Sequence, residues 1–136
     1  MTGETFLGLP SAELASVDAD VVILGAPHGV AYPLPGMATD CADAPAAIRR
    51  RSARLARFAA NHDFDLDGPM LPAGADGSPA LRVVDCGDVP GSRGDGAANV
   101  AGIERAVRTL VERGAIPLVL GGDDSVPIPV LRGLAS

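Results

Sequence analysis

The sequence contains no lysine and no tryptophan, and aromatic residues make up 3% of its 136 positions. Because so few aromatic side chains are present, the core must be built from aliphatic residues, and surfaces that stack on bases or sugars are disfavoured. The net charge of −6 also argues against nucleic acid or an anionic membrane surface as a partner. A cationic substrate or a metal ion is compatible with this charge.

Cysteine is scarce as well, and Cys41 and Cys86 form neither a disulfide framework nor a CxxC zinc pattern. No apolar run reaches the ~20 residues that span a bilayer. The first fourteen residues lack the basic and apolar segments of a signal peptide. Since 47% of the residues are apolar, the sequence predicts one domain with a buried core, in a soluble and cytoplasmic protein that does not bind membranes.

Short apolar runs alternate with longer amphipathic segments. Residues 20–27, 81–89 and 115–122 are predicted strands, rich in β-branched residues and followed by turn signals. Residues 43–60 and 97–114 are predicted helices, and a third helix begins after Ser125. Residues 61–80, rich in Asp, Gly and Pro, are predicted to be a flexible loop with a short hairpin. This alternation predicts an α/β fold with a parallel sheet.

Details of the two helices set further expectations. Asp43 is placed to cap the first helix, and Ile48, Leu55 and Phe58 fall on one face with arginines on the others, as in a helix that packs an apolar stripe on a core. In the second helix, apolar residues recur at helical spacing up to Gly114, which is expected to end it.

Polar or special residues follow each predicted strand. Pro27–Gly29 follow the first, Asp85–Asp88 end the second, and Asp123 and Asp124 follow the third. Parallel strands bring these ends to one edge of the sheet, where sites form in open α/β sheets. Two neighbouring carboxylates suit a divalent cation, which relieves their repulsion. Alternatively, Asp123, Asp124 or Ser125 caps the helix that follows.

Three other patterns have competing interpretations. The run beginning at Asp63 matches the start of a calcium loop, but Gly74 stands where the twelfth position requires Glu, so a solvated turn is favoured. In the long loop GAPHGVAYPLPG, His28 and Tyr32 are candidate substrate contacts or residues packed in the loop. Cys86 has acidic neighbours, which disfavour a thiolate, and is better explained as a small buried residue, while Asp85 and Asp88 satisfy loop N–H groups.

Taken together, DVVILGAPHG, APAAIR, RVVDCGDV and NVAGIERAVRTLVERGAIPLVLGGDDSVPIPVL resemble the N-terminal part of the ureohydrolases, the family of agmatinase, arginase and guanidinobutyrase, with agmatinases the more similar. The resemblance implies a three-layer α/β/α fold with a parallel sheet, of which this chain has the N-terminal half, assembled into trimers or hexamers. It implies two divalent metal ions, Mn²⁺ before Ni²⁺, and hydrolysis of a small cationic guanidino substrate to urea and an amine. Asp124 is the implied metal ligand and Asp123 its neighbour.

The sequence departs from that family in three places. Asp124 stands where the family motif GGDHS has a metal-binding histidine. The segment at 33–45, PLPGMATDCADAP, replaces the usual Arg-Pro-Gly and Gly-Pro elements of the substrate loop. The D-A-H-x-D motif and the later D-x-D motif do not follow Asp124 here. A non-catalytic or degenerate subunit that pairs with an active homologue is therefore a second hypothesis. A small nucleotide-binding module is a third, although no phosphate-cradling glycine pattern supports it.

Overall fold

A computed structural model describes residues 4–30 and 40–135 of the chain. At its centre is a parallel three-stranded sheet in the order β4-β1-β5, so that the first strand lies in the middle. The strands are β1 (Val21–Ala26), β4 (Val83–Asp88) and β5 (Ile116–Gly121). Each falls within a segment whose apolar run predicts a strand, so these three predictions are confirmed.

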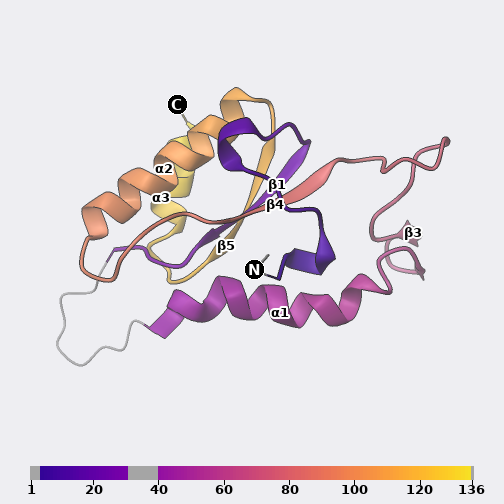
Figure 1. Cartoon of the computed structure of the whole chain (residues 1–136), viewed down its shortest axis with the longest axis horizontal. Helices are drawn as coiled ribbons and strands as arrows, with labels where there is room; N and C mark the ends of the chain where they lie inside the picture. Colours follow the sequence, from indigo (N-terminus) through magenta and orange to yellow (C-terminus); the bar gives the residue numbers. More distant parts are fainter. Residues whose placement is uncertain (1–3, 31–39, 136) are drawn as a thin grey trace.

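Helices cover both faces of the sheet (Figure 1). On one face lies α1 (Ala44–Ala56), and on the other α2 (Gly96–Glu112) packs beside α3 (Pro127–Leu134). This arrangement confirms the predicted three-layer α/β/α fold with a parallel sheet. Three short 3-10 helices complete the order of elements: η1 (Phe6–Gly8), η2 (Leu14–Ser16) and η3 (Asp40–Asp43). Within the described residues, no helix has the length and apolar character needed to cross a bilayer.

The main hydrophobic core lies between the sheet and α2. Val22 and Leu24 of β1 are almost completely buried there, against Ile103, Val107 and Leu110 of α2. These three α2 residues belong to the stripe that the helical spacing predicts. Gly114 follows the helix with a φ of +77°, a conformation that favours glycine and ends α2 as expected.

The prediction for the apolar face of α1 is wrong. Ile48, Leu55 and Phe58 are all exposed, by 38%, 41% and 46%, whereas the buried positions of α1 include Arg49 and Ser52. The physical reason lies in the sheet beneath the helix. A buried carboxylate of β4 requires a cationic partner there, so the helix turns its arginine inward.

Neither helix start uses the side-chain cap that the sequence favours. Asp43 precedes α1 but has helical backbone angles and makes no capping hydrogen bond to the described residues. For α3, the capping position is Val126, which again has helical angles, while Pro127 occupies the first turn. The alternative prediction, that an aspartate after β5 caps α3, is therefore not supported.

Residues 61–80 contain a small projection beyond the end of α1. Here β2 (His62–Asp63) pairs with β3 (Gly68–Pro69) in an antiparallel hairpin. Asp63 Oδ1 accepts the N–H groups of Asp65 and Leu66, at 2.9 and 3.3 Å, and so closes the turn. In the sequence motif that resembles a calcium loop, the first carboxylate is thus used by the backbone of the turn.

Candidate functional site

The loops that follow β1 and β5 are in direct contact at the carboxyl edge of the sheet. Val30 N–H donates to Ser125 Oγ at 2.7 Å. A Cβ on Gly29 would overlap Ser125 Oγ and lie 2.6 Å from Asp123 Oδ1, so only glycine allows this approach. On the other side, a Cβ on Gly122 would lie 2.6 Å from the Pro27 carbonyl oxygen. The predicted convergence of these two strand ends is therefore confirmed.

Asn99 joins the loop after β4 to the loop after β1. This residue is 3% exposed in the first turns of α2. Its Nδ2 donates to Gly29 O at 3.0 Å and to Ser92 O at 2.7 Å, while its Oδ1 accepts Ser92 N–H at 3.0 Å. Sequence reasoning missed Asn99, although an amide inside an apolar-periodic helix is a signal that could have drawn attention to it.

The candidate site is a small cavity of about 20 Å³ at this edge. Its lining combines residues from all three loops: Pro27, His28, Gly29, Val30, Arg93, Asn99 and Asp123. His28 and Asp123 are both half-buried. The sequence identified these two from separate motifs, and the structure places both on one cavity. Arg93 was not predicted; it lies in a turn-rich segment that gives no periodic signal.

The predicted site residues do not all reach this cavity. Asp123 Oδ1 accepts hydrogen bonds from the N–H of Ser125, at 2.9 Å, and from its hydroxyl. Asp124 is exposed and is not part of the cavity lining. Tyr32 lies outside the described residues. Substrate binding by His28 and Tyr32, and metal binding by Asp123 and Asp124, thus stay predictions.

The residues after β5 do not by themselves form a metal site. Carboxylate oxygens are suitable ligands for Mn²⁺. Within residues 4–30 and 40–135, however, no group of three or more His, Cys, Asp or Glu side chains could hold a metal ion. The described residues alone therefore do not fit a resident divalent metal, and any such site requires donors from elsewhere.

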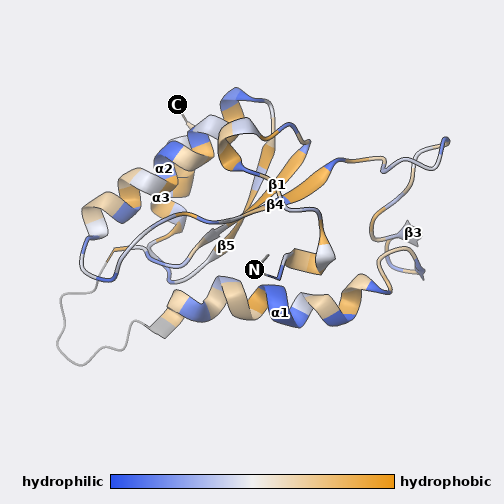
Figure 2. Cartoon of the chain, in the orientation of Figure 1, coloured by the Kyte–Doolittle hydropathy of each residue, from blue (hydrophilic) through white to orange (hydrophobic). Residues whose placement is uncertain are grey.

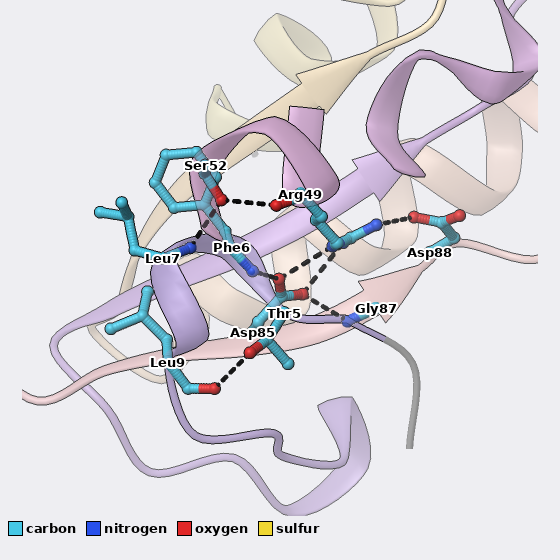
Figure 3. Close-up of polar contacts among 9 residues, drawn as sticks. All are labelled: Thr5, Phe6, Leu7, Leu9, Arg49, Ser52, Asp85, Gly87 and Asp88. Carbon is cyan, nitrogen blue, oxygen red and sulfur yellow. Dashed lines mark hydrogen bonds and ion pairs between the residues drawn. The ribbon is translucent and has the colours of Figure 1, made fainter. Parts of the chain in front are cut away.

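The aspartates of β4 form an ion network with α1 that is buried at Asp85 and exposed at Asp88 (Figure 3). Arg49 donates through Nε and Nη2 to the two oxygens of Asp85, at 2.8 and 2.9 Å, and through Nη1 to Asp88 at 2.5 Å. Asp85 also accepts the N–H groups of Phe6 and Gly87, at 2.8 and 2.9 Å. The prediction that these aspartates accept hydrogen bonds from backbone N–H groups is confirmed for Asp85. The ion pair with Arg49 was not predicted.

This network decides the charge of Asp85. Burial by itself would raise the pKa of the carboxyl group, but the hydrogen bonds from Arg49, Phe6 and Gly87 outweigh burial, and the pKa is lowered. Next to it, Cys86 is half-buried rather than fully buried, and burial together with the charge of Asp85 raises the pKa of its thiol. A raised pKa opposes the thiolate form, which agrees with the prediction that Cys86 is not a reactive cysteine.

Comparison with known proteins places this geometry in context. The model of the arginase family matches residues 19–136. Agmatinase of Edwardsiella ictaluri is 36% identical over 118 residues, which are 87% of this chain and 35% of that protein. Agmatinase of Neisseria meningitidis serogroup C is 32% identical over 117 residues, 86% of this chain and 34% of that protein. The chain thus spans about a third of the length of these relatives.

Solved structures show the same fold. A hypothetical agmatinase from Burkholderia thailandensis aligns with a TM-score of 0.72 at 24% identity, over 97% of this chain and 37% of that one, which shows the fold alone. The proclavaminate amidino hydrolase from Streptomyces clavuligerus gives a TM-score of 0.68 at 26% identity, over 99% of this chain and 40% of that one. Arginase from Bacillus subtilis gives 0.55 at 26% identity, over 85% and 33%.

Proposed function

We propose a function from the premise that the chain belongs to the arginase family. Its 136 residues form the N-terminal part of a single α/β domain. That domain hydrolyses a small guanidino compound to urea and an amine. The observation that carries this proposal is the meeting of the loops after β1 and β5, which brings His28 and Asp123 to one cavity at the carboxyl edge. Ligands of open parallel sheets bind at this edge.

The proposed cofactor is a pair of divalent ions, with Mn²⁺ preferred and Ni²⁺ second. Asp124 is the proposed ligand from this chain, and Asp123, which holds the turn through Ser125, positions it. Because the described residues contain no complete donor set, the remaining ligands come from sequence outside them or from a partner. Divalent ions in hydrolases lower the pKa of bound water and so supply a nucleophile at neutral pH.

The proposed substrate is a small guanidinium compound such as agmatine or guanidinobutyrate. The agmatinases among the relatives favour this class, and the acidic chain suits a cation. His28 is the described residue best placed to contact it, and Tyr32 is the second candidate. We further propose that the protein works in the cytoplasm as a trimer or hexamer, formed with its own copies or with a homologue.

A second candidate function is a non-catalytic subunit that pairs with an active homologue. Two observations favour it: an aspartate at position 124, where the resemblance implies a histidine, and the incomplete donor set of the described residues. An additional carboxylate makes the position more negative than a neutral imidazole does, so it changes the preference for the metal.

Urea release and metal binding, measured together, separate the two functions. With the remaining metal ligands supplied by further sequence or by a partner, we expect urea from agmatine or guanidinobutyrate when Mn²⁺ is added, whereas these 136 residues alone should release none. In the same assembly, calorimetry should show an at least tenfold weaker Mn²⁺ affinity in Asp124→Asn, because loss of a residue at a metal site costs about that much. Glu112→Gln, which removes an exposed carboxylate at the end of α2, is the matched control. Unchanged Mn²⁺ affinity in Asp124→Asn would exclude this ligand, and absence of urea from both agmatine and guanidinobutyrate would favour the non-catalytic subunit.

A further inference from the structure

Residues 62–69, here called the arm, present large apolar side chains to solvent. Phe64 is 91% exposed and Leu66 is 62% exposed, at the turn between β2 and β3. The turn is held by Asp63, and the ring of His62 packs edge-on against Phe64 with centroids 5.1 Å apart. The arm is tied back where it leaves the hairpin, since Leu71 N–H donates to Ala59 O at 3.1 Å. These contacts fix Phe64 and Leu66 outward.

The same turn is acidic. Asp63, Asp65 and Asp67 alternate with the two apolar residues, and the last two are exposed. Three of the seventeen acidic residues of the chain therefore lie in this one turn. A surface that combines aromatic area with this charge fits a partner that is apolar and basic at once.

The outer face of α1 has those properties. Arg51, Arg54, Leu55 and Phe58 follow the i, i+3, i+4, i+7 spacing of one helical face, continued into the turn after α1, and all four are exposed. We call them the arginine face. Figure 2 shows hydrophilic and hydrophobic bands alternating along α1. The face exists because Arg49 and Ser52 turn inward, as described above.

The arm does not pack on the arginine face of its own chain in this structure, because Phe64 is 91% exposed. The two surfaces are nevertheless complementary in charge and both partly apolar. A second copy of the chain supplies each surface with the one that it lacks.

We propose that the arm of one copy of this chain docks on the arginine face of a second copy. Asp65 and Asp67 meet Arg51 and Arg54, while Phe64 packs against Leu55 and Phe58. The contact does not depend on the proposed hydrolase activity, because neither surface includes residues of the cavity at the carboxyl edge. This contact gives the arm a function, whereas the sequence pattern alone predicts only a solvated turn.

Sedimentation equilibrium over a concentration series tests the proposal on the whole chain. We expect a mass of at least two copies that falls as salt is raised, because screening weakens exposed charge pairs. Arg54→Glu and Asp65→Arg, each alone, are expected to weaken association about tenfold through like-charge contact. Phe64→Ser is expected to weaken it about thirtyfold, as removal of a central aromatic anchor does.

A charge exchange gives the sharpest measurement. Mixing Arg54→Glu chains with Asp65→Arg chains, or placing both changes in one chain, is expected to restore association, whereas each variant alone stays weak. Arg105→Glu reverses an exposed arginine of α2 and is the matched control, expected to leave association unchanged. Circular dichroism confirms that each variant folds.

Three outcomes would overturn the proposal. The first is a chain that stays monomeric at every concentration, and the second is a pair of charge variants that the exchange does not rescue. The third is association that survives the arm variants but is lost in Leu118→Arg. Leu118 is exposed on β5, whose outer edge pairs with no other strand among the described residues, so this result would place the contact at that edge.

Discussion

β4 itself and the loop that follows β5 both carry aspartates, and these two regions, here called the β4 end and the β5 end, are built differently. Asp85 and Asp88 of β4 are joined by Arg49 to a helix 36 and 39 positions earlier in the chain. After β5, Asp123 accepts from Ser125, two positions later, and so shapes its own loop. An aspartate within a strand can therefore hold two elements together, whereas one in the loop after a strand shapes a local turn. Burial distinguishes the two cases: Asp85 is 1% exposed, whereas Asp123 is half-buried.

This difference separates a closed region of the molecule from a region that borders a cavity. At β4, a guanidinium, two backbone N–H groups and the segment around η1 surround the carboxylate (Figure 3). At β5, the loop borders the cavity with His28 and Arg93. The experiments below test whether the β4 end is structural and the β5 end is not, beginning with the largest expected effect.

Arg49→Met should be the most damaging change, because it leaves Asp85 buried without its ionic partner. Breaking a buried ion pair on one side costs about 3–5 kcal/mol, so we expect a loss of that order in the free energy of unfolding, measured in urea. The matched control is Arg50→Met, the same change at the exposed neighbouring position, which should stay within about 0.5 kcal/mol of wild type. If Arg49→Met and Arg50→Met lose the same free energy of unfolding, the buried ion pair of β4 does not stabilise the fold.

Arg49 also marks the limit of what the sequence could predict. The strands, α2 and the meeting of the strand ends follow from local periodicity and from the rules of parallel sheets. The three layers follow from the family resemblance, and all of these features are found. The orientation of α1 was mispredicted, since Ile48, Leu55 and Phe58 form a convincing apolar stripe. What overrides that stripe is a buried charge in β4, more than thirty residues away, which a pattern within one helix does not reveal.

The second largest effect should come from low pH, which removes the contribution of the β4 end to the free energy of unfolding. Because the folded-state pKa of Asp85 lies below its ordinary value of 3.8, its contribution is fully present above that value and is lost as the pH falls through the folded pKa. We therefore expect the free energy of unfolding to decline below about pH 4, with a shallower decline in Asp85→Asn. Asp18 is a contrasting case, because Arg82 lowers its pKa in a pair that is exposed to solvent.

The control for this titration is Asp18→Asn. Solvent screens an exposed pair, so this variant should keep nearly the whole acid decline of the wild type. Equal acid profiles for Asp18→Asn and Asp85→Asn, both shallower than wild type, would mean that surface carboxylates control acid unfolding. The distinction between a buried network and an ordinary surface pair would then lose its energetic basis.

Asn99→Ala should have the smallest effect on stability and the most specific one on the site. It removes the partner of Gly29 O and of the Ser92 N–H and C=O groups, which costs about 1–3 kcal/mol if these groups stay dry and less if water reaches them. We expect about 1 kcal/mol, because Ser92 is exposed and can be solvated. Hydrogen exchange at Val30, whose N–H donates to Ser125, should accelerate more than exchange in β4. A uniform acceleration would mean that Asn99 supports the whole domain rather than the loops around the cavity, and the two ends of the sheet would then be one cooperative unit.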